Sequence, residues 1–101
     1  MVTVRELLER KEFDFSHGEI ILHEELRGII SKNGKKVLNS HPFLDEEFNN
    51  DFGGIEIPSF IAKDGKFLYV VACYDGATWV EKISLDLNYY LKNYPPCIGG
   101  G

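Results

Sequence analysis

The clearest alternation of apolar and polar positions lies between residues 55 and 83. Three extended runs occur there: 55–63, 66–74 and 77–83. Asp64-Gly65 separates the first two runs, and Asp75-Gly76 separates the last two. Because Asp-Gly tolerates the positive φ angles of a type I′ turn, each pair predicts a tight hairpin. The pattern therefore predicts a three-stranded antiparallel meander.

Two-residue turns also fix the strand register, here with Lys63 opposite Lys66 and Tyr74 opposite Ala77. One sheet face then carries the side chains that we predict to form the core: Ile55, Ile57, Ile61, Leu68, Val70, Ala72, Trp79 and Ile83. The other face is also rich in apolar residues and carries Phe60, Phe67, Tyr69, Val71, Cys73 and Val80, together with Glu56 and Lys82. Since Pro58 lacks a backbone N–H, the first strand is predicted to be an edge strand at that position.

Helices are predicted on both sides of this region. Thr3-Val4-Arg5-Glu6 fits a capping box and predicts an N-terminal helix over 4–11. Ser84 is predicted to cap a C-terminal helix over 85–93 that ends before Pro95-Pro96. Its apolar side chains recur at helical spacing: Leu87, Tyr90, Leu91 and Tyr94.

The segment 19–38 is compatible with two structures. Leu22, Leu26, Ile29 and Ile30 match a helical stripe, but Gly28 would cost about 1 kcal/mol inside a helix. Asn33-Gly34 is the strongest two-residue hairpin signal. We favour a further hairpin over 19–38. Residues 39–54 predict a loop, with a short helical turn at 44–48.

A chain of 101 residues with 44% apolar residues predicts a single α+β domain over 1–96, followed by a flexible tail at 97–101. It contains no apolar run of about 18 residues and no apolar stretch typical of a signal peptide. The two cysteines, Cys73 and Cys97, are read as thiols of a reducing compartment. We therefore expect a soluble, cytoplasmic protein without membrane contact.

Charge is distributed unevenly along the chain. The formal net charge is −5, and no Lys or Arg occurs between Lys36 and Lys63. The charged side chains of that window are all carboxylates: Asp45, Glu46, Glu47, Asp51 and Glu56. A nucleic-acid-binding protein needs the opposite, a basic stripe that displaces counterions. Direct binding to nucleic acid is therefore not expected.

The acidic window alternates carboxylates with aromatic residues, a composition suited to a basic surface on another protein. Charge would speed the encounter, and aromatic side chains would supply most of the affinity. The candidate partner-binding residues are Phe43, Asp45, Glu46, Glu47, Phe48, Asp51, Phe52, Phe60, Phe67 and Tyr69. We expect a non-enzymatic protein-binding module, of the kind that phages and mobile elements use to inhibit basic nucleic-acid-handling proteins. The second apolar sheet face also offers a surface for homo-oligomerisation.

Enzymatic chemistry has little support in the sequence. The chain lacks a P-loop, a Gly-x-Gly-x-x-Gly loop, a Gly-x-Ser-x-Gly elbow and a Cys-x-x-Cys pair. The residue types that bind zinc are scattered, at His17, His23, His41, Cys73 and Cys97, without a selective spacing. We expect no catalytic residue, no metal and no cofactor. The alternative is a small ligand-binding domain or enzyme with a dispersed pocket that uses His41, Tyr74 and Trp79.

A third interpretation rests on the C-terminal residues. Pro95-Pro96-Cys97-Ile98-Gly99-Gly100 resembles the tail of the molybdopterin-synthase small subunit, a ubiquitin-like sulfur carrier. The resemblance implies a terminal glycine carboxylate that is activated by adenylation. It covers six of the 101 residues and departs from the family because a predicted helix precedes the tail and an extra glycine follows it.

Overall fold

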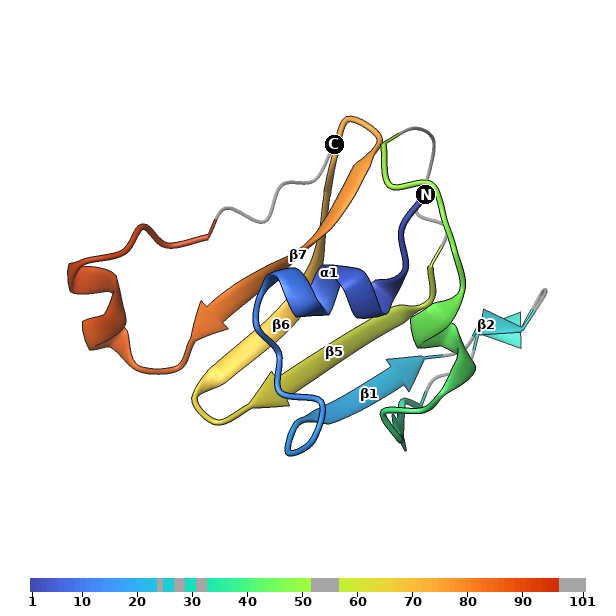
Figure 1. The fold of residues 1–101 in the computed structure, drawn as a ribbon, viewed down its shortest axis with the longest axis horizontal. Coiled ribbons are helices and arrows are strands. Elements are labelled where there is room, and N and C mark those ends of the chain that lie inside the picture. The colour runs from blue at the N-terminus through green and yellow to red at the C-terminus, as the bar shows by residue number, and fades with distance from the viewer. Residues whose placement is uncertain (24, 27–28, 31–32, 52–56, 97–101) are drawn as a thin grey trace.

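The computed structural model describes residues 1–23, 25–26, 29–30, 33–51 and 57–96. Its centre is a five-stranded antiparallel sheet in the order β4-β1-β5-β6-β7 (Figure 1). The strands are β1 (Glu19–His23), β4 (Lys35–Val37), β5 (Ser59–Asp64), β6 (Phe67–Tyr74) and β7 (Ala77–Ser84). A separate two-stranded sheet joins β2 (Glu25–Leu26) to β3 (Ile29–Ile30). Together with an N-terminal helix, this confirms a small α+β domain built around a meander.

The second meander turn has the predicted register. Tyr74 lies opposite Ala77, and the two residues between them, Asp75 and Gly76, have φ angles of 49° and 83°. Two successive positive φ angles are the mark of a type I′ turn, whose twist matches that of the flanking strands. The Asp-Gly signal therefore identified this turn correctly.

The first meander turn lies one residue later than predicted. Asp64 pairs with Phe67, so the loop is Gly65-Lys66 and the predicted pairing of Lys63 with Lys66 is wrong. Asp64 is the last residue of β5, and its carboxylate accepts hydrogen bonds from the Tyr69 hydroxyl at 2.9 and 3.0 Å. Gly65, with a φ of +48°, then takes the first loop position. The register moves by two positions, so the same residues still share each face.

The core lies mainly on the face opposite to the predicted one, and of the predicted core residues that the structure describes only Ala72 is buried. The buried side chains on the meander include Phe60, Tyr69 and Val80, which belong to the face that we did not assign to the core. We call the opposite side of the sheet the outer face, and there Ile61 is 39% exposed. Both faces are apolar, so alternation could not rank them. The core face is the one that the helical layer of the domain covers.

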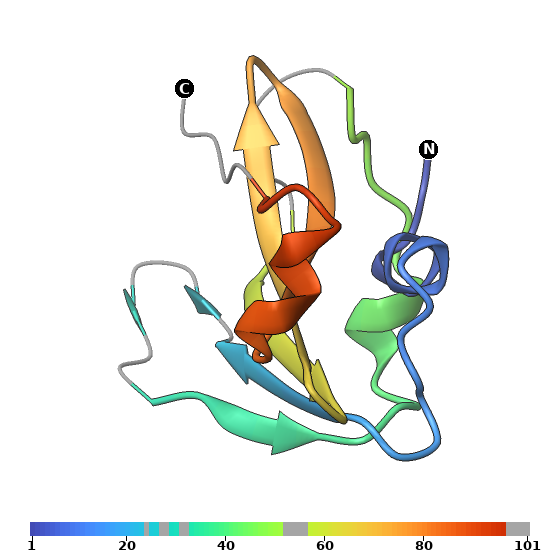
Figure 2. The same cartoon turned by 90° about the vertical axis from the view of Figure 1, so that its left-hand side faces the viewer.

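The covering layer consists of helix α1 (Val4–Arg10) and a 3₁₀ helix η1 (Pro42–Asp45), which lie on the same side of the sheet (Figure 2). Helix α1 starts as predicted, since the Thr3 hydroxyl accepts from the Glu6 amide at 3.1 Å. It ends one residue before the predicted boundary at 11. Rings from this layer pack against the sheet: Phe43 on Phe60 at 5.6 Å and Phe13 on Tyr69 at 5.1 Å between centroids.

Strand β5 is central, which corrects the prediction of an edge strand. It lies between β1 and β6, and Ile21 pairs with Ile61 on the β1 side. Pro58 stands just before the strand begins at Ser59, so its missing N–H removes no hydrogen bond from the sheet. Residues 55–56 of the predicted strand lie outside the described residues, and Ile57 is not in a strand.

The preference for strands over 19–38 is confirmed, but the predicted turn is not. Strand β1 pairs with β4, with Ile20 opposite Val37, while Leu26 of β2 pairs with Ile29 of β3. Asn33-Gly34 therefore connects β3 to β4 and does not form the tight hairpin turn. A Cβ on Gly34 would lie 2.6 Å from both His23 Nε2 and Ile21 Cγ2, so glycine allows this close approach to β1.

The C-terminal helix is shorter than predicted. The chain forms a 3₁₀ helix, η2 (Leu87–Leu91), whose N-cap is Asp86 and not Ser84. Ser84 is the last residue of β7, and its amide donates to the Tyr90 hydroxyl at 2.7 Å. Leu87 and Leu91 are 83% and 80% exposed, so no core contact extends the helix. The predicted tail at 97–101 lies outside the described residues.

Candidate functional site

The aromatic residues of the predicted binding surface are mostly core residues. Phe43, Phe48, Phe60 and Tyr69 are all at most 7% exposed. Phe67 is half-buried and packs edge-on against Tyr89 at 5.6 Å, and Phe52 lies outside the described residues. The buried rings hold the α1–η1 layer onto the sheet. They offer little surface to a partner.

Among the predicted carboxylates, Asp45 is already engaged within the chain. Arg5 donates to it from Nε at 2.7 Å and from Nη2 at 3.1 Å, and Nη2 also donates to the Asn39 carbonyl at 2.8 Å. The hydrogen bonds from the Arg5 guanidinium lower the pKa of Asp45, and those same bonds raise the pKa of Arg5. This bidentate ion pair joins α1 to the end of η1.

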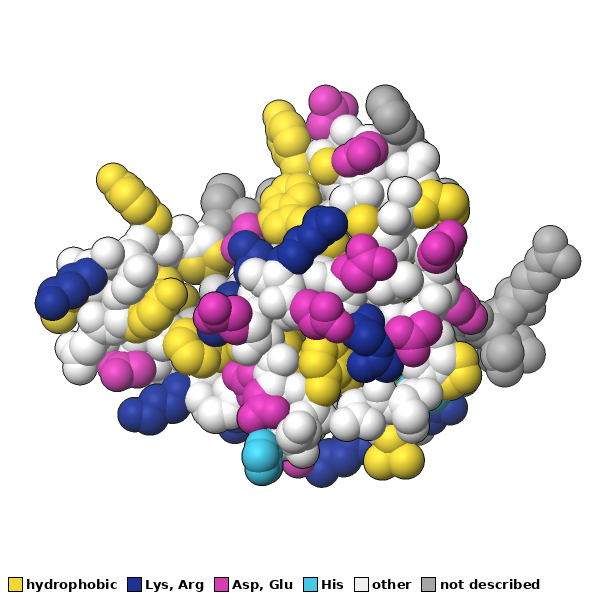
Figure 3. Space-filling model, in the orientation of Figure 1, with side chains coloured by type: hydrophobic (Ala, Val, Ile, Leu, Met, Phe, Trp, Pro, Cys, Tyr) yellow, Lys and Arg dark blue, Asp and Glu magenta, His cyan; other side chains and the backbone are white. Residues whose placement is uncertain are grey.

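The remaining predicted carboxylates reach solvent. Glu46, Glu47 and Asp51 are exposed, and the neighbouring helix α1 adds Glu6 and Glu9 to the same side of the molecule. Figure 3 shows acidic side chains spread over this side, above α1 and the segment that follows η1. We call this side the acidic face. Sequence reasoning missed Glu6 and Glu9, because no local signal indicates that α1 packs beside η1.

The acidic face carries an excess of negative charge. The two segments that contribute to it, 1–14 and 42–51, contain these carboxylates: Glu6, Glu9, Glu12, Asp14, Asp45, Glu46, Glu47 and Asp51. The cationic side chains of the same segments are Arg5, Arg10 and Lys11. The tertiary structure therefore enlarges the acidic window of the sequence by adding the N-terminal helix to it.

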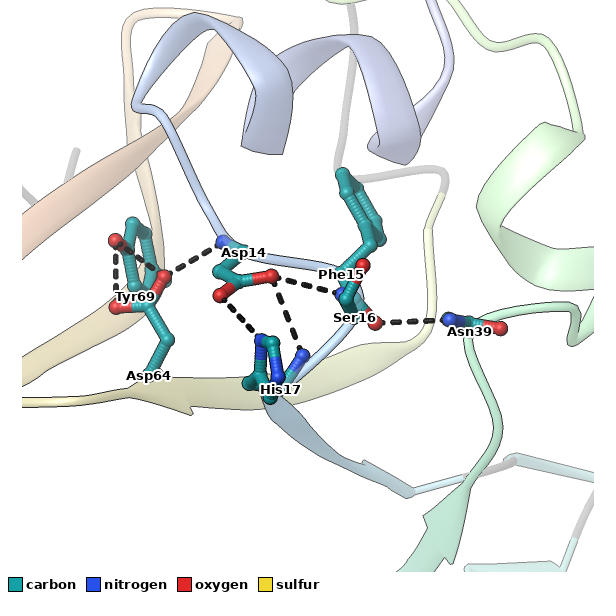
Figure 4. A network of polar contacts seen from close by, with 7 residues as sticks. All are labelled: Asp14, Phe15, Ser16, His17, Asn39, Asp64 and Tyr69. Atoms are coloured by element: carbon teal, nitrogen blue, oxygen red, sulfur yellow. Dashed lines mark hydrogen bonds and ion pairs between the residues drawn. The ribbon is translucent and has the colours of Figure 1, made fainter.

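A second polar cluster lies where the turn after α1 meets β5 (Figure 4). The Asp64 carboxylate accepts from the Tyr69 hydroxyl and from the Asp14 amide, the latter at 2.6 Å. Asp14 in turn accepts from the Ser16 amide at 2.9 Å and lies 3.0 Å from His17 Nδ1. The His17 hydrogen bond lowers the pKa of Asp14, while burial, followed by the Asp64 hydrogen bond, raises the pKa of Tyr69.

This cluster has a structural role. The Asp14–Asp64 bond fixes the turn between α1 and β1 onto the end of β5, and the bonds from Ser16 and His17 to Asp14 hold the turn itself. Ser16 takes part through its backbone amide and not through its hydroxyl, which a nucleophile–base pair would require.

Besides a hollow along the C-terminal segment 90–95, two hollows at the surface of the described residues border the sheet. One of about 180 Å³ lies between the turn after α1 and the end of β4, and its lining is Phe13, Phe15, Ser16, Gly18, Ile20, Val37, Leu38 and Asn39. Another of about 330 Å³ lies where β5 diverges from β6, and its lining is Ile57, Pro58, Ser59, Phe60, Ile61, Val70, Val71 and Cys73. Neither lining contains the paired acid and base that general acid–base catalysis requires.

The residues of the dispersed-pocket alternative do not come together. His41 caps η1 on the covered side of the sheet, where its Nδ1 accepts from the Phe43 amide at 3.2 Å. Trp79 lies on the outer face and donates to Glu81 at 2.6 Å. Tyr74, 61% exposed, stands beside the β6–β7 turn. Among the described residues, no three His, Cys, Asp or Glu side chains gather as a metal site would require.

No protein-family model, curated protein or solved structure matches the chain. In the part of the chain that the structure describes, no helix has the length and apolar character needed to cross a membrane. The function must therefore be argued from the surface itself.

Proposed function

We propose that the protein is a non-enzymatic binding module whose acidic face docks on a basic surface of another protein. The observation that carries this proposal is that α1 and η1 pack together on one side of the sheet, and that α1 and the segment after η1 carry exposed carboxylates: Glu6, Glu9, Glu46, Glu47 and Asp51. The two elements that carry them are tied together by the Arg5–Asp45 pair. This ion pair holds α1 against η1, so the carboxylates that these segments carry keep a fixed arrangement.

The mode of binding follows from what the face contains. Aromatic anchors usually supply most of the binding free energy at an interface. Here the rings of Phe43 and Phe48 are buried, so the described part of the face binds chiefly through charge. Charge complementarity speeds association and makes it dependent on salt. We expect rapid binding that weakens steeply as ionic strength rises.

The partner that best fits is a protein with a polybasic surface for nucleic acid. Such a surface is built to neutralise closely spaced phosphates. A layer of exposed carboxylates offers a similar density of negative charge and would compete for it. We accordingly propose inhibition of a nucleic-acid-handling protein, as acidic proteins of phages and mobile elements achieve it.

Competition with DNA tests this proposal. A labelled duplex is bound to members of a panel of purified polybasic DNA-binding domains, and the protein is titrated in while displacement is followed by fluorescence anisotropy. We expect displacement from some members of the panel, with an inhibition constant that rises about tenfold or more between 50 and 200 mM salt.

A matched pair of variants separates the acidic face from net charge alone. Glu46→Gln with Glu47→Gln removes two carboxylates from the face, and we expect about tenfold weaker displacement. Glu19→Gln with Asp75→Asn removes the same charge elsewhere and should change displacement by less than about twofold. Equal losses in the two variants, or no displacement from any domain, would overturn the proposal.

A further inference from the structure

The outer face of the sheet is apolar and electrically balanced. Ile21 and Ile61 lie side by side at its centre, and each is 39% exposed. The half-buried side chains around them include Val70, Trp79 and Ile83. Its charged side chains balance one another: Glu19, Lys36, Lys63 and Glu81. Two acidic faces would repel each other if two copies of the chain met there. Two outer faces would not, because the outer face carries no net charge.

One row of side chains crosses the outer face from edge to edge. The strand registers place in line Lys36 on β4, Ile21 on β1, Ile61 on β5, Val70 on β6 and Glu81 on β7. The row thus begins with a cation, ends with an anion and is apolar between them. Its midpoint is Ile61, on the central strand.

This row is complementary to itself. A two-fold axis that runs along β5 turns a second outer face onto the first and reverses the strand order. Lys36 of each copy then meets Glu81 of the other, and Ile61 meets its own symmetry mate. A two-fold axis across the strands would instead place Lys36 on Lys36 and Glu81 on Glu81. Isologous interfaces of this kind are the commonest form of protein assembly.

We propose that the outer face binds a second copy of this chain, with Lys36 and Glu81 as reciprocal ion pairs at the two edges. Five strands about 4.8 Å apart and on average about 20 Å long give an outer face of roughly 500 Å² per copy. The total is near the lower limit for a specific interface, so the dimer is weak.

Reversing the charges of Lys36 and Glu81 gives a test whose result cannot arise within a single chain. Within one chain β4 and β7 are the two outermost strands, so Lys36 and Glu81 are separated by about 19 Å, four strand spacings. At that distance their interaction in one chain is screened by physiological salt. Any coupling between substitutions at the two positions must therefore act between copies.

Sedimentation equilibrium over a concentration series measures the dimer. The unmodified chain should associate reversibly at concentrations of about 0.1–1 mM. Lys36→Glu and Glu81→Lys should each raise the dissociation constant about tenfold, since each makes the two contacts between copies repulsive. Lys36 also lies 3.0 Å from Glu19 and Glu81 accepts from Trp79 within one chain, so thermal unfolding of each single variant is measured as well. The double variant should return to within about threefold of the unmodified chain. Lys92→Glu, on the C-terminal segment, is the control and should have no effect.

Ile61→Asp provides a second, independent variant, because the substituted carboxylate would face its own symmetry mate. The position is on the exposed face, so the thermal unfolding of the monomer reports whether the variant is folded. We expect a folded monomer. An unmodified chain that remains monomeric over the whole series, a double variant no better than the singles, or an Ile61→Asp variant that still dimerises would each overturn the inference.

Discussion

Single residues with two partners hold this fold together at the points where its layers meet. Asp64 binds the Tyr69 hydroxyl and the Asp14 amide, and so fixes both the β5–β6 turn and the segment after α1. Arg5 binds Asp45 and the Asn39 carbonyl, and so joins α1 to the segment that carries η1. Asp64 accepts its hydrogen bonds and Arg5 donates its own, and in both cases the charged group makes the contact stronger than one between neutral groups.

These ion pairs predict a loss of stability in acid. The pKa values of Asp14, Glu19 and Asp45 are lowered by hydrogen bonds from His17, Lys36 and Arg5 respectively. A carboxylate whose pKa is lower in the folded state stabilises it at pH values above about 4, the range of its unfolded pKa. That stabilisation disappears as the pH falls through the folded value. Thermal unfolding from pH 6 to pH 2 should therefore show a falling melting temperature below about pH 4.

Asp45→Asn isolates one of these contributions. This variant should be less stable than the unmodified chain at pH 6 and should lose less stability on acidification, so that the two curves converge near pH 2. Glu47→Gln is the control, because the structure records no ion pair for Glu47 within the described residues. Parallel curves for Asp45→Asn and the unmodified chain would show that the Arg5 contact contributes nothing.

At the scale of elements, local signals determine some features of the fold and tertiary contacts determine others. The cap at Thr3 and the turn at Asp75-Gly76 are each completed by groups within a few residues, and both occur where the sequence predicts them. The predicted helix at 85–93 depended on a packing surface for its apolar stripe. That surface is not provided by the described residues, and only the short helix η2 forms.

The β6–β7 turn offers a test of this local control. Gly76 has a φ of 83°, a region that alanine enters only at a cost of about 1–2 kcal/mol. Gly76→Ala should lower the free energy of unfolding by about that amount in urea denaturation. Gly65→Asn is the matched control, since Gly65 has a φ of +48° with open space around it and asparagine tolerates this region. Equal stability of Gly76→Ala and the unmodified chain would contradict the type I′ assignment.

At the scale of the whole molecule, apolar side chains fall into two classes. One class fills the space between the sheet and the α1–η1 layer, where Leu22 and Leu44 are fully buried. The other is exposed or half-buried, on the outer face and along the C-terminal segment from Leu85 to Tyr94. Apart from Ala72, every buried apolar side chain of the described residues belongs to the first class. The second class is surface available for association.

Two leucines distinguish these classes experimentally. Leu44 is 0% exposed, so Leu44→Ala should cost about 2–5 kcal/mol through lost contacts and the cavity that remains. Leu87 is 83% exposed, so Leu87→Ala should stay within about 0.5 kcal/mol of the unmodified chain. Urea denaturation at a low protein concentration measures both. A large loss at Leu87 would contradict the exposure of its side chain.

The candidate site was predictable only in part. Glu46, Glu47 and Asp51 lie in an acid-only window that is visible in the chain, and they are exposed as a binding role requires. The aromatic residues Phe43 and Phe48 of the same window are buried in the core. The sequence alone could not show whether these rings would form the core or a binding surface. Glu6 and Glu9 joined the surface through the packing of α1 beside η1, a contact between segments about 40 residues apart.

The sequence by itself determined the helix start, the existence and order of the three meander strands and the type of the second turn. Those features depend on groups that are neighbours along the chain, so residue types alone specify them. Only the tertiary structure decided which sheet face is the core, that β5 is central, and which carboxylates share a surface. Those outcomes depend on which distant segment covers which face. Both faces were apolar enough to be covered, so the pattern of the strands held no information on the choice.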